Sequence, residues 1–128
     1  MPTTTVSPAT RATLNSIAML HEACGDASRL RLINLLAGGE QCVCDLVGLM
    51  GESQPFVSRH LARLRAAGIV GVERRGKFAY YHLLELAAPT QRQLDAILEG
   101  LAAADQRLRR ERNAAAASAA KRSATPCL

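Results

Sequence analysis

Apolar residues recur every three or four positions along most of residues 10–67, a spacing that places them on one face of an α-helix. Glycines and capping side chains interrupt this pattern, because glycine ends helices while serine and aspartate favour the start of the next one. The interruptions predict four helices, over residues 10–24, 27–37, 43–50 and 54–67.

The pattern changes to that of a strand after Gly68. Between residues 69 and 84 the side chains alternate with a period of two, and a charged turn containing Gly76 divides the segment. This predicts a β-hairpin with a basic tip. Thr90 is then placed to cap a last helix, whose apolar residues follow the alternating steps of three and four that are typical of paired helices. Those residues are Leu94, Ile97, Leu101, Ala104 and Leu108.

Together the segments predict a mainly α-helical fold with a small β-hairpin, in the order four helices, two strands and one further helix. Two helices joined by a short turn and followed by a basic hairpin form a winged helix-turn-helix. We expect the folded domain to span residues 10–110. Residues 1–9 are expected to form a disordered N-terminus, and residues 111–128 a flexible tail rich in alanine and basic residues.

Composition favours a soluble protein of one domain. The chain has 128 residues, of which 48% are hydrophobic and 21% are charged. No apolar run approaches the roughly 18 residues that a membrane helix needs, and the N-terminus lacks the order of a signal peptide. We therefore expect a cytoplasmic protein that does not contact membranes and whose four cysteines stay reduced.

Positive charge is concentrated in two parts of the chain: the predicted helix-turn-helix and hairpin, and residues 109–128, which carry five basic and one acidic side chains. Residues 53–82 carry six basic and one acidic side chains, whereas residues 1–52 carry three basic and five acidic ones. A basic block on an otherwise acidic domain indicates a surface for DNA phosphate. His60 has an alternative role as a half-buried packing residue. The candidate DNA-binding residues are Ser53, Gln54, Ser58, Arg59, His60, Arg63, Arg74, Arg75 and Lys77.

A dimer is expected because a domain of this size makes few contacts with DNA by itself. A homodimer would bind double-stranded operator DNA with a near-palindromic sequence and half-sites about one helical turn apart. The alternative is that the last helix simply packs on its own core. The candidate interface residues are Leu14, Ile17, Leu94, Ile97, Leu101 and Leu108.

Two of the four cysteines, Cys42 and Cys44, lie at the start of the third predicted helix. Their thiolates suit soft, thiophilic ions such as arsenite, antimonite, cadmium or lead. On a regular helix, side chains two positions apart point about 200° apart. The pair can therefore share one ion only if the chain is not helical there, or if the helix end distorts when the ion binds.

The sequence resembles the ArsR/SmtB family of metal-responsive repressors over residues 12–105. The resemblance is carried by residues 23–32, 40–46, 53–61, 64–70 and 75–81, which include Glu-Gln-Cys-Val-Cys-Asp-Leu and Ser-Gln-Pro-Phe-Val-Ser-Arg-His-Leu. It implies a homodimeric winged-helix repressor, with its dimer surface on the first and last helices, that releases operator DNA when a metal or metalloid binds.

The stretch around Cys42 and Cys44 is similar to the arsenite-sensing branch of that family, in which these two residues take the places of thiolate ligands. Arsenite or antimonite is then the implied inducer. That branch often has a third cysteine, which Val47 replaces here. Three sources of a third sulfur stay open: Cys24, Cys127, or a small thiol such as glutathione.

Alternatives to an arsenic-responsive repressor keep the same fold. One is a repressor that responds to cadmium or lead, and another is a repressor controlled by thiol oxidation. We do not expect an enzyme, because the sequence has no Cys-x-x-Cys at a helix start, no phosphate loop and no Ser/His/Asp set.

Ligand binding at the thiols is expected to deform the first turn of the helix over 43–50 and so to displace the DNA-reading helix.

Overall fold

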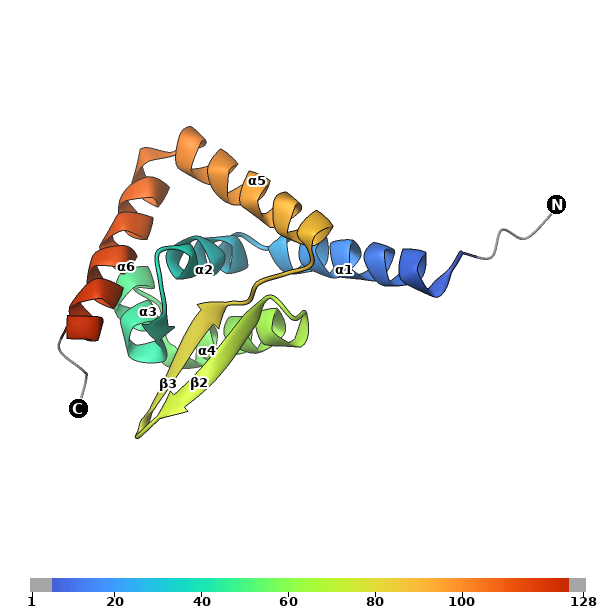
Figure 1. The fold of residues 1–128 in the computed structure, drawn as a ribbon. Helices are drawn as coiled ribbons and strands as arrows, with labels where there is room; N and C mark the ends of the chain where they lie inside the picture. The colour runs from blue at the N-terminus through green and yellow to red at the C-terminus, as the bar shows by residue number, and fades with distance from the viewer. Residues whose placement is uncertain (1–5, 125–128) are drawn as a thin grey trace.

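The computed structural model describes residues 6–124 of the chain. Its helices and strands surround one hydrophobic core, and the hairpin projects from the helices (Figure 1). In chain order the elements are α1 (Pro8–Cys24), α2 (Ala27–Ala37), β1 (Gln41–Cys42), α3 (Val43–Met50), α4 (Gln54–Ala66), β2 (Val70–Arg75), β3 (Phe78–Leu83), α5 (Ala88–Ala104) and α6 (Gln106–Ala124). No helix in this part of the chain is long and apolar enough to cross a membrane.

Capping side chains start the helices largely where the sequence predicts them. Asp26 caps α2 by accepting a hydrogen bond from the Arg29 N–H at 3.0 Å. Ser53 caps α4 in the same way, with Pro55 in the first turn, where its missing N–H costs nothing. The prediction that Thr90 caps α5 is wrong. That helix begins earlier, at Ala88, and Thr90 is buried in its first turn.

The predicted hairpin is confirmed, with β2 and β3 antiparallel and Arg75 opposite Phe78 beside the turn. Gly76 in that turn has a φ of 60°, a left-handed conformation that glycine adopts at little cost. A third strand, β1, pairs with the other edge of β3 and gives the strand order β1-β3-β2. In this pairing Cys42 lies opposite Tyr80. The sequence did not predict β1, because a strand of two residues has no detectable period.

The hydrophobic core fixes the positions of α3 and α4. Leu46 of α3 and Val57 and Leu61 of α4 are fully buried, together with four apolar residues of α2. The two helices of the helix-turn-helix are therefore fixed to one another and to α2 by the same apolar cluster. A displacement at the start of α3 would be transmitted to α4 through this packing.

The segment after residue 104 differs from the expected flexible tail. Asp105 has an extended backbone (φ −139°, ψ 118°), which ends α5, and residues 106–124 then form α6. Figure 1 shows α6 turning back from the end of α5 and running past α2. Leu108 consequently belongs to α6 and does not continue the apolar stripe of α5.

Small residues allow α6 to pack closely on the end of α2. Ala115 is completely buried, and a side chain at Gly38 would collide with the main-chain carbonyl of Arg112. Polar contacts add to this packing, because buried Asn34 donates to the Leu108 carbonyl at 2.8 Å and accepts from the Arg112 guanidinium at 2.6 Å. Close packing of small residues and hydrogen bonds of buried polar groups therefore hold α6 against the end of α2.

The expected dimer residues differ in their exposure to solvent. Leu94 is completely buried within the protomer, so its assignment to a surface open to a partner is wrong. Leu14 is 57% exposed on α1 and is therefore accessible to a partner. The remaining four, Ile17, Ile97, Leu101 and Leu108, are half-buried.

Candidate metal centre and nucleic-acid interface

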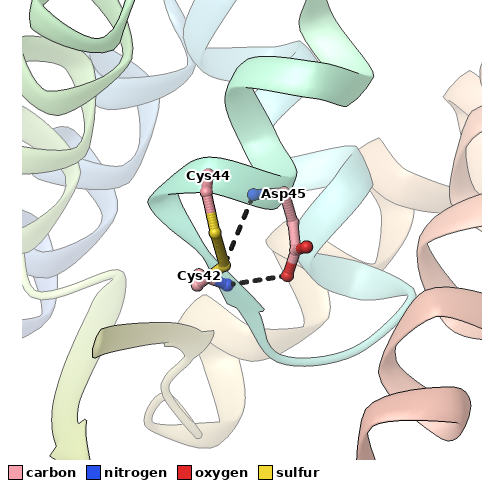
Figure 2. A group of neighbouring side chains, drawn as sticks. All are labelled: Cys42, Cys44 and Asp45. Atoms are coloured by element: carbon pink, nitrogen blue, oxygen red, sulfur yellow. Dashed lines mark hydrogen bonds between the residues drawn. A yellow bond between two sulfur atoms is a disulfide. The ribbon is translucent and has the colours of Figure 1, made fainter. Parts of the chain in front are cut away.

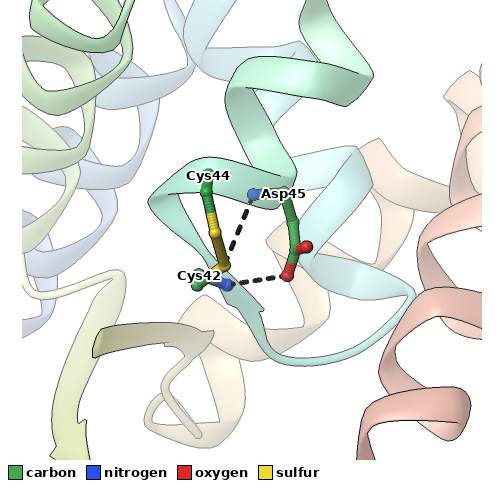
Figure 3. The surroundings of a disulfide bond; sticks show 3 residues. All are labelled: Cys42, Cys44 and Asp45. Carbon is green, nitrogen blue, oxygen red and sulfur yellow. Dashed lines mark hydrogen bonds between the residues drawn. A yellow bond between two sulfur atoms is a disulfide. The ribbon is translucent and has the colours of Figure 1, made fainter. Parts of the chain in front are cut away.

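The sulfur atoms of Cys42 and Cys44 meet at the junction of β1 and α3. Cys42 is the last residue of β1 and the N-cap of α3, with an extended backbone (φ −81°, ψ 164°), while Cys44 lies in the first turn of the helix. Their Cα atoms are 5.4 Å apart, and the two side chains form a disulfide (Figure 3). The condition that the chain be non-helical at the pair is therefore met, because only one of the two cysteines is on the helix.

Asp45 completes a compact group with the two cysteines. The Asp45 N–H donates to Cys42 Sγ at 3.4 Å, and the Cys42 N–H donates to Asp45 Oδ2 at 3.2 Å, a reciprocal capping arrangement (Figure 2). One ligand atom from each of these three residues lies within 4.8 Å of the others. Asp45 was not among the predicted site residues, although an acidic residue three positions after a helix N-cap is a recognisable capping signal.

The group can offer two sulfurs and one carboxylate oxygen to an ion. Cys42 is only 3% exposed, whereas Cys44 is exposed, so the group is open to solvent on one side. Thiolates select soft ions, and they coordinate only as free thiolates. The disulfide therefore has to be reduced before the two sulfurs can act as ligands.

Cys24, one of the two candidates for a third cysteine ligand, is not part of this group. Cys24 is half-buried at the end of α1 and packs against the core. Burial raises the pKa of its thiol, and the nearby Arg29 charge offsets only part of this effect. Within the described residues the metal-ligating group contains Cys42, Cys44 and Asp45 but not Cys24. Cys127 lies outside the described residues, and Val47 is half-buried and offers no ligand atom.

The candidate DNA-binding residues of α4 are mostly exposed. Arg59 and Arg63 project to solvent, and Ser53 and Gln54 are exposed at the N-terminus of the helix, where main-chain N–H groups favour phosphate. Ser58 is half-buried. His60 is also half-buried, with its Nδ1 4.0 Å from Asp26 Oδ1 and its ring edge-on to Phe56 at 4.6 Å. These contacts favour the packing role for His60.

The wing carries the remaining candidates. Arg74 and Lys77 are exposed near the turn. Arg75 instead forms an ion pair with Glu40 and lies over the Tyr80 ring, 4.0 Å from its centroid. The hydrogen bond to Glu40 raises the pKa of the Arg75 guanidinium, so its charge is secure. The sequence does not predict this pair, because no local pattern connects residues 35 positions apart.

An exposed basic helix, preceded by a helix packed against it and followed by a basic hairpin, defines a winged helix-turn-helix of the DNA-binding class. The model of the arsR family of bacterial regulatory proteins matches residues 26–72. Over 69 residues the chain is 36% identical to an uncharacterized HTH-type transcriptional regulator of Methanocaldococcus jannaschii, and the match covers 53% of this chain and 78% of that protein. The chain belongs to the ArsR family of transcriptional regulators.

Two further relatives have names that refer to arsenic. The chain is 43% identical over 82 residues to the arsenic resistance transcriptional regulator ArsR1 of Pseudomonas putida, covering 63% of this chain and 62% of the relative. It is 43% identical over 65 residues to the arsenical resistance operon repressor of Escherichia coli, covering 50% of this chain and 56% of the relative. The chain thus spans between half and two thirds of the length of these relatives.

Solved structures share the fold. The transcriptional repressor BigR of Xylella fastidiosa has a TM-score of 0.60 at 29% identity, with 76% of this chain and 97% of that chain covered. The homodimeric winged helix-turn-helix domain of Mb0332 from Mycobacterium bovis has a TM-score of 0.61 at 25% identity, with 74% and 86% covered. The winged helix-turn-helix predicted from the sequence is therefore confirmed.

Proposed function

We propose that this chain is a homodimeric, cytoplasmic repressor of an arsenic-resistance operon, released from its operator when arsenite or antimonite binds Cys42 and Cys44. The observation that carries the proposal is the meeting of both sulfur atoms at the N-cap of α3, the first helix of the helix-turn-helix. The names of the Pseudomonas putida and Escherichia coli relatives support arsenic as the signal. The homodimeric neighbour from Mycobacterium bovis supports the dimer.

The chemistry at the pair starts from reduced thiols. A cellular thiol such as glutathione supplies the two electrons and two protons that convert the disulfide to two thiol groups. Cys42 and Cys44 then each exchange a proton for a bond to arsenic, and two hydroxyl groups of As(OH)₃ leave as two molecules of water. Arsenic stays trivalent throughout. Its third position is taken by the remaining hydroxyl, by the adjacent Asp45 carboxylate, or by a third thiolate.

Binding at Cys42 changes the start of α3. The sulfur that accepts the Asp45 N–H would then also bond to arsenic, which draws electron density from the sulfur and weakens this capping bond. Caps of this kind contribute about 0.5–2 kcal/mol to helix stability. Because Leu46 of α3 and Leu61 of α4 share one buried cluster, a change in the first turn of α3 displaces α4 relative to the operator.

An electrophoretic mobility shift assay with DNA from upstream of the gene tests this function. Arsenite and antimonite are expected to release the reduced protein at lower concentrations than cadmium or zinc. Cys42→Ser and Cys44→Ser are expected to bind DNA and to ignore arsenite. The same changes at Cys24 and Cys127 show whether either residue supplies the third sulfur. Normal arsenite release by both Cys42→Ser and Cys44→Ser would refute the assignment.

The disulfide favours one second candidate, a repressor controlled by thiol oxidation. In that case hydrogen peroxide would accept two electrons and two protons from the Cys42 and Cys44 thiols, giving the disulfide and two molecules of water. The same assay separates the two functions. Release by peroxide together with no response of the reduced protein to arsenite would favour oxidation as the signal.

A further inference from the structure

A second relationship links the thiol pair to the wing and does not pass through α4. Glu40 directly precedes β1 and lies two residues before Cys42. Its carboxylate forms an ion pair with Arg75, at the end of β2. The Arg75 guanidinium also lies over the ring of Tyr80, the residue that pairs with Cys42 across β1 and β3. The strands β1 and β3 therefore carry both Cys42 and the Tyr80 ring against which the Arg75 guanidinium lies.

The Glu40 carboxylate and a DNA phosphate compete for the same N–H donors of the Arg75 guanidinium. The planar fork of arginine N–H donors binds a carboxylate and a phosphate in the same geometry. While the Arg75 Nη2 group donates to Glu40 Oε1, it cannot take part in a paired contact of the guanidinium with a DNA phosphate. The neighbouring Arg74 and Lys77 make no ion pair with any residue that the structure describes, so the restraint falls on Arg75.

The positions of Glu40 and of the Cys42 sulfur are linked through the backbone, because Glu40 directly precedes the two residues of β1. The structure has the sulfurs of Cys42 and Cys44 drawn together, and an ion held by both sulfurs requires a similar approach. With the sulfurs together, β1 lies against β3 and the Glu40 carboxylate reaches Arg75. When the thiols are free and separate, this constraint on the residues beside Cys42 is removed.

We propose that Glu40 is a positioning residue that couples the thiol site to the wing: when an inducer draws Cys42 and Cys44 together, Glu40 withdraws Arg75 from a DNA phosphate. The inference rests on the proposed function, because it requires an inducer at the two cysteines. It adds a second route of release beside the displacement of α4. Removing the Glu40 charge should therefore weaken the response to inducer without removing inducer binding.

The test measures operator affinity by fluorescence anisotropy, with and without arsenite, at several salt concentrations. In the wild-type protein, arsenite is expected to make the salt dependence shallower, and the loss of the Arg75 phosphate contact should account for about 0.9 log units per log unit of salt for each subunit. In Glu40→Gln the arsenite-induced change of slope should be smaller than in the wild type by about 0.9 for each subunit, because only the contribution of α4 remains. The arsenite-induced loss of affinity should be about fivefold smaller than in the wild type, a coupling at the lower end of the usual range.

Glu85→Gln is the matched control, because it removes an equal charge from an exposed position beyond the end of β3 that makes no ion pair with Arg75. It should respond to arsenite as the wild type does. Arg75→Lys keeps the positive charge but lacks the fork, and should also respond less. This second variant tests the pair by itself if Glu40→Gln folds poorly.

Arsenite binding is followed separately by the ultraviolet absorption of arsenic–thiolate bonds in the same samples. Wild-type release from Glu40→Gln with unchanged arsenite absorption would overturn the inference and leave the proposed function standing. Loss of the arsenite absorption in Glu40→Gln would also overturn it, because Glu40 would then act at the thiol site itself. No release of the wild-type protein by arsenite would overturn the proposed function and the inference together.

Discussion

The buried side chain of Gln41 donates a hydrogen bond of 2.8 Å to the main-chain carbonyl of Ala115. It ties α6 to the strand that carries Cys42, across 74 positions of sequence. The Cys42–Cys44 site is thus bounded on one side by the hairpin and on another by the helix that follows α5. Changes in the packing of α6 are therefore expected to reach the thiol site.

The close packing of α6 on the loop before β1 gives a first prediction. Gly38→Ala would place a methyl group against the Arg112 carbonyl and close to Ala115, so we expect a loss of about 1–3 kcal/mol of unfolding free energy, as for other overpacked sites. Urea unfolding measures the loss. Gly48→Ala is the control, because nothing lies within 4 Å of a side chain there and alanine favours its helix. Equal stabilities of the two variants would contradict the close packing of α6.

The apolar residues predicted to form the dimer surface give a second prediction, because they differ in burial. Leu94→Ala opens a cavity in the protomer core and is expected to cost about 2–5 kcal/mol of unfolding free energy. Leu14→Glu changes an exposed side chain and should leave the protomer folded while weakening dimerisation. Circular dichroism and sedimentation velocity separate these effects. A Leu14→Glu protein that stays dimeric at the lowest measurable concentration would remove this part of α1 from the interface.

A third prediction concerns the exposed face of α4. Arg59→Ala should lower operator affinity and make the salt dependence shallower by about 0.9 for each subunit, the value for one phosphate contact. If Arg59 contacts a base instead, affinity should fall only for the specific sequence. Arg65→Ala is the comparison, because Arg65 is exposed in the last turn of the same helix, away from its N-terminus. An equal effect of both changes would indicate general charge attraction only.

The chemistry of Cys24 gives a fourth prediction. Burial raises the pKa of its thiol, so less of it is thiolate at neutral pH, and thiolate is the form that reacts. In the reduced protein, iodoacetamide should modify exposed Cys44 before Cys24. The rate at Cys24 should keep rising with pH above the ordinary thiol pKa. Mass spectrometry of the cysteine peptides follows both rates, and faster modification of Cys24 would show that it is not packed as described.

Much of the fold was accessible from sequence because its signals are local. Apolar periodicity and the caps at Asp26 and Ser53 predicted α2 and α4, and alternation around Gly76 predicted the hairpin. Helical geometry also predicted that Cys42 and Cys44 could approach one another only if the chain was not a regular helix at the pair. The structure meets it by making Cys42 the cap of α3.

The remaining features depend on contacts between distant parts of the chain. The strand β1 is two residues long and exists through its pairing with β3. Helix α6 is stabilised by Gly38 and Asn34 of distant segments, which a composition rich in alanine does not reveal. The ion pair of Glu40 with Arg75 likewise has no local signature. These features could be recognised only once the contacting residues in distant parts of the chain were known.

The central claim is that the thiols at the cap of α3 control DNA binding. The most direct measurement is operator affinity of the reduced protein, by fluorescence anisotropy with increasing arsenite, for the wild type, Cys44→Ser and Cys24→Ser. We expect arsenite to lower the affinity of the wild type at least fivefold, within the usual range of allosteric coupling. Cys44→Ser should bind the operator equally well and not respond. An unchanged arsenite response in Cys44→Ser would contradict the account.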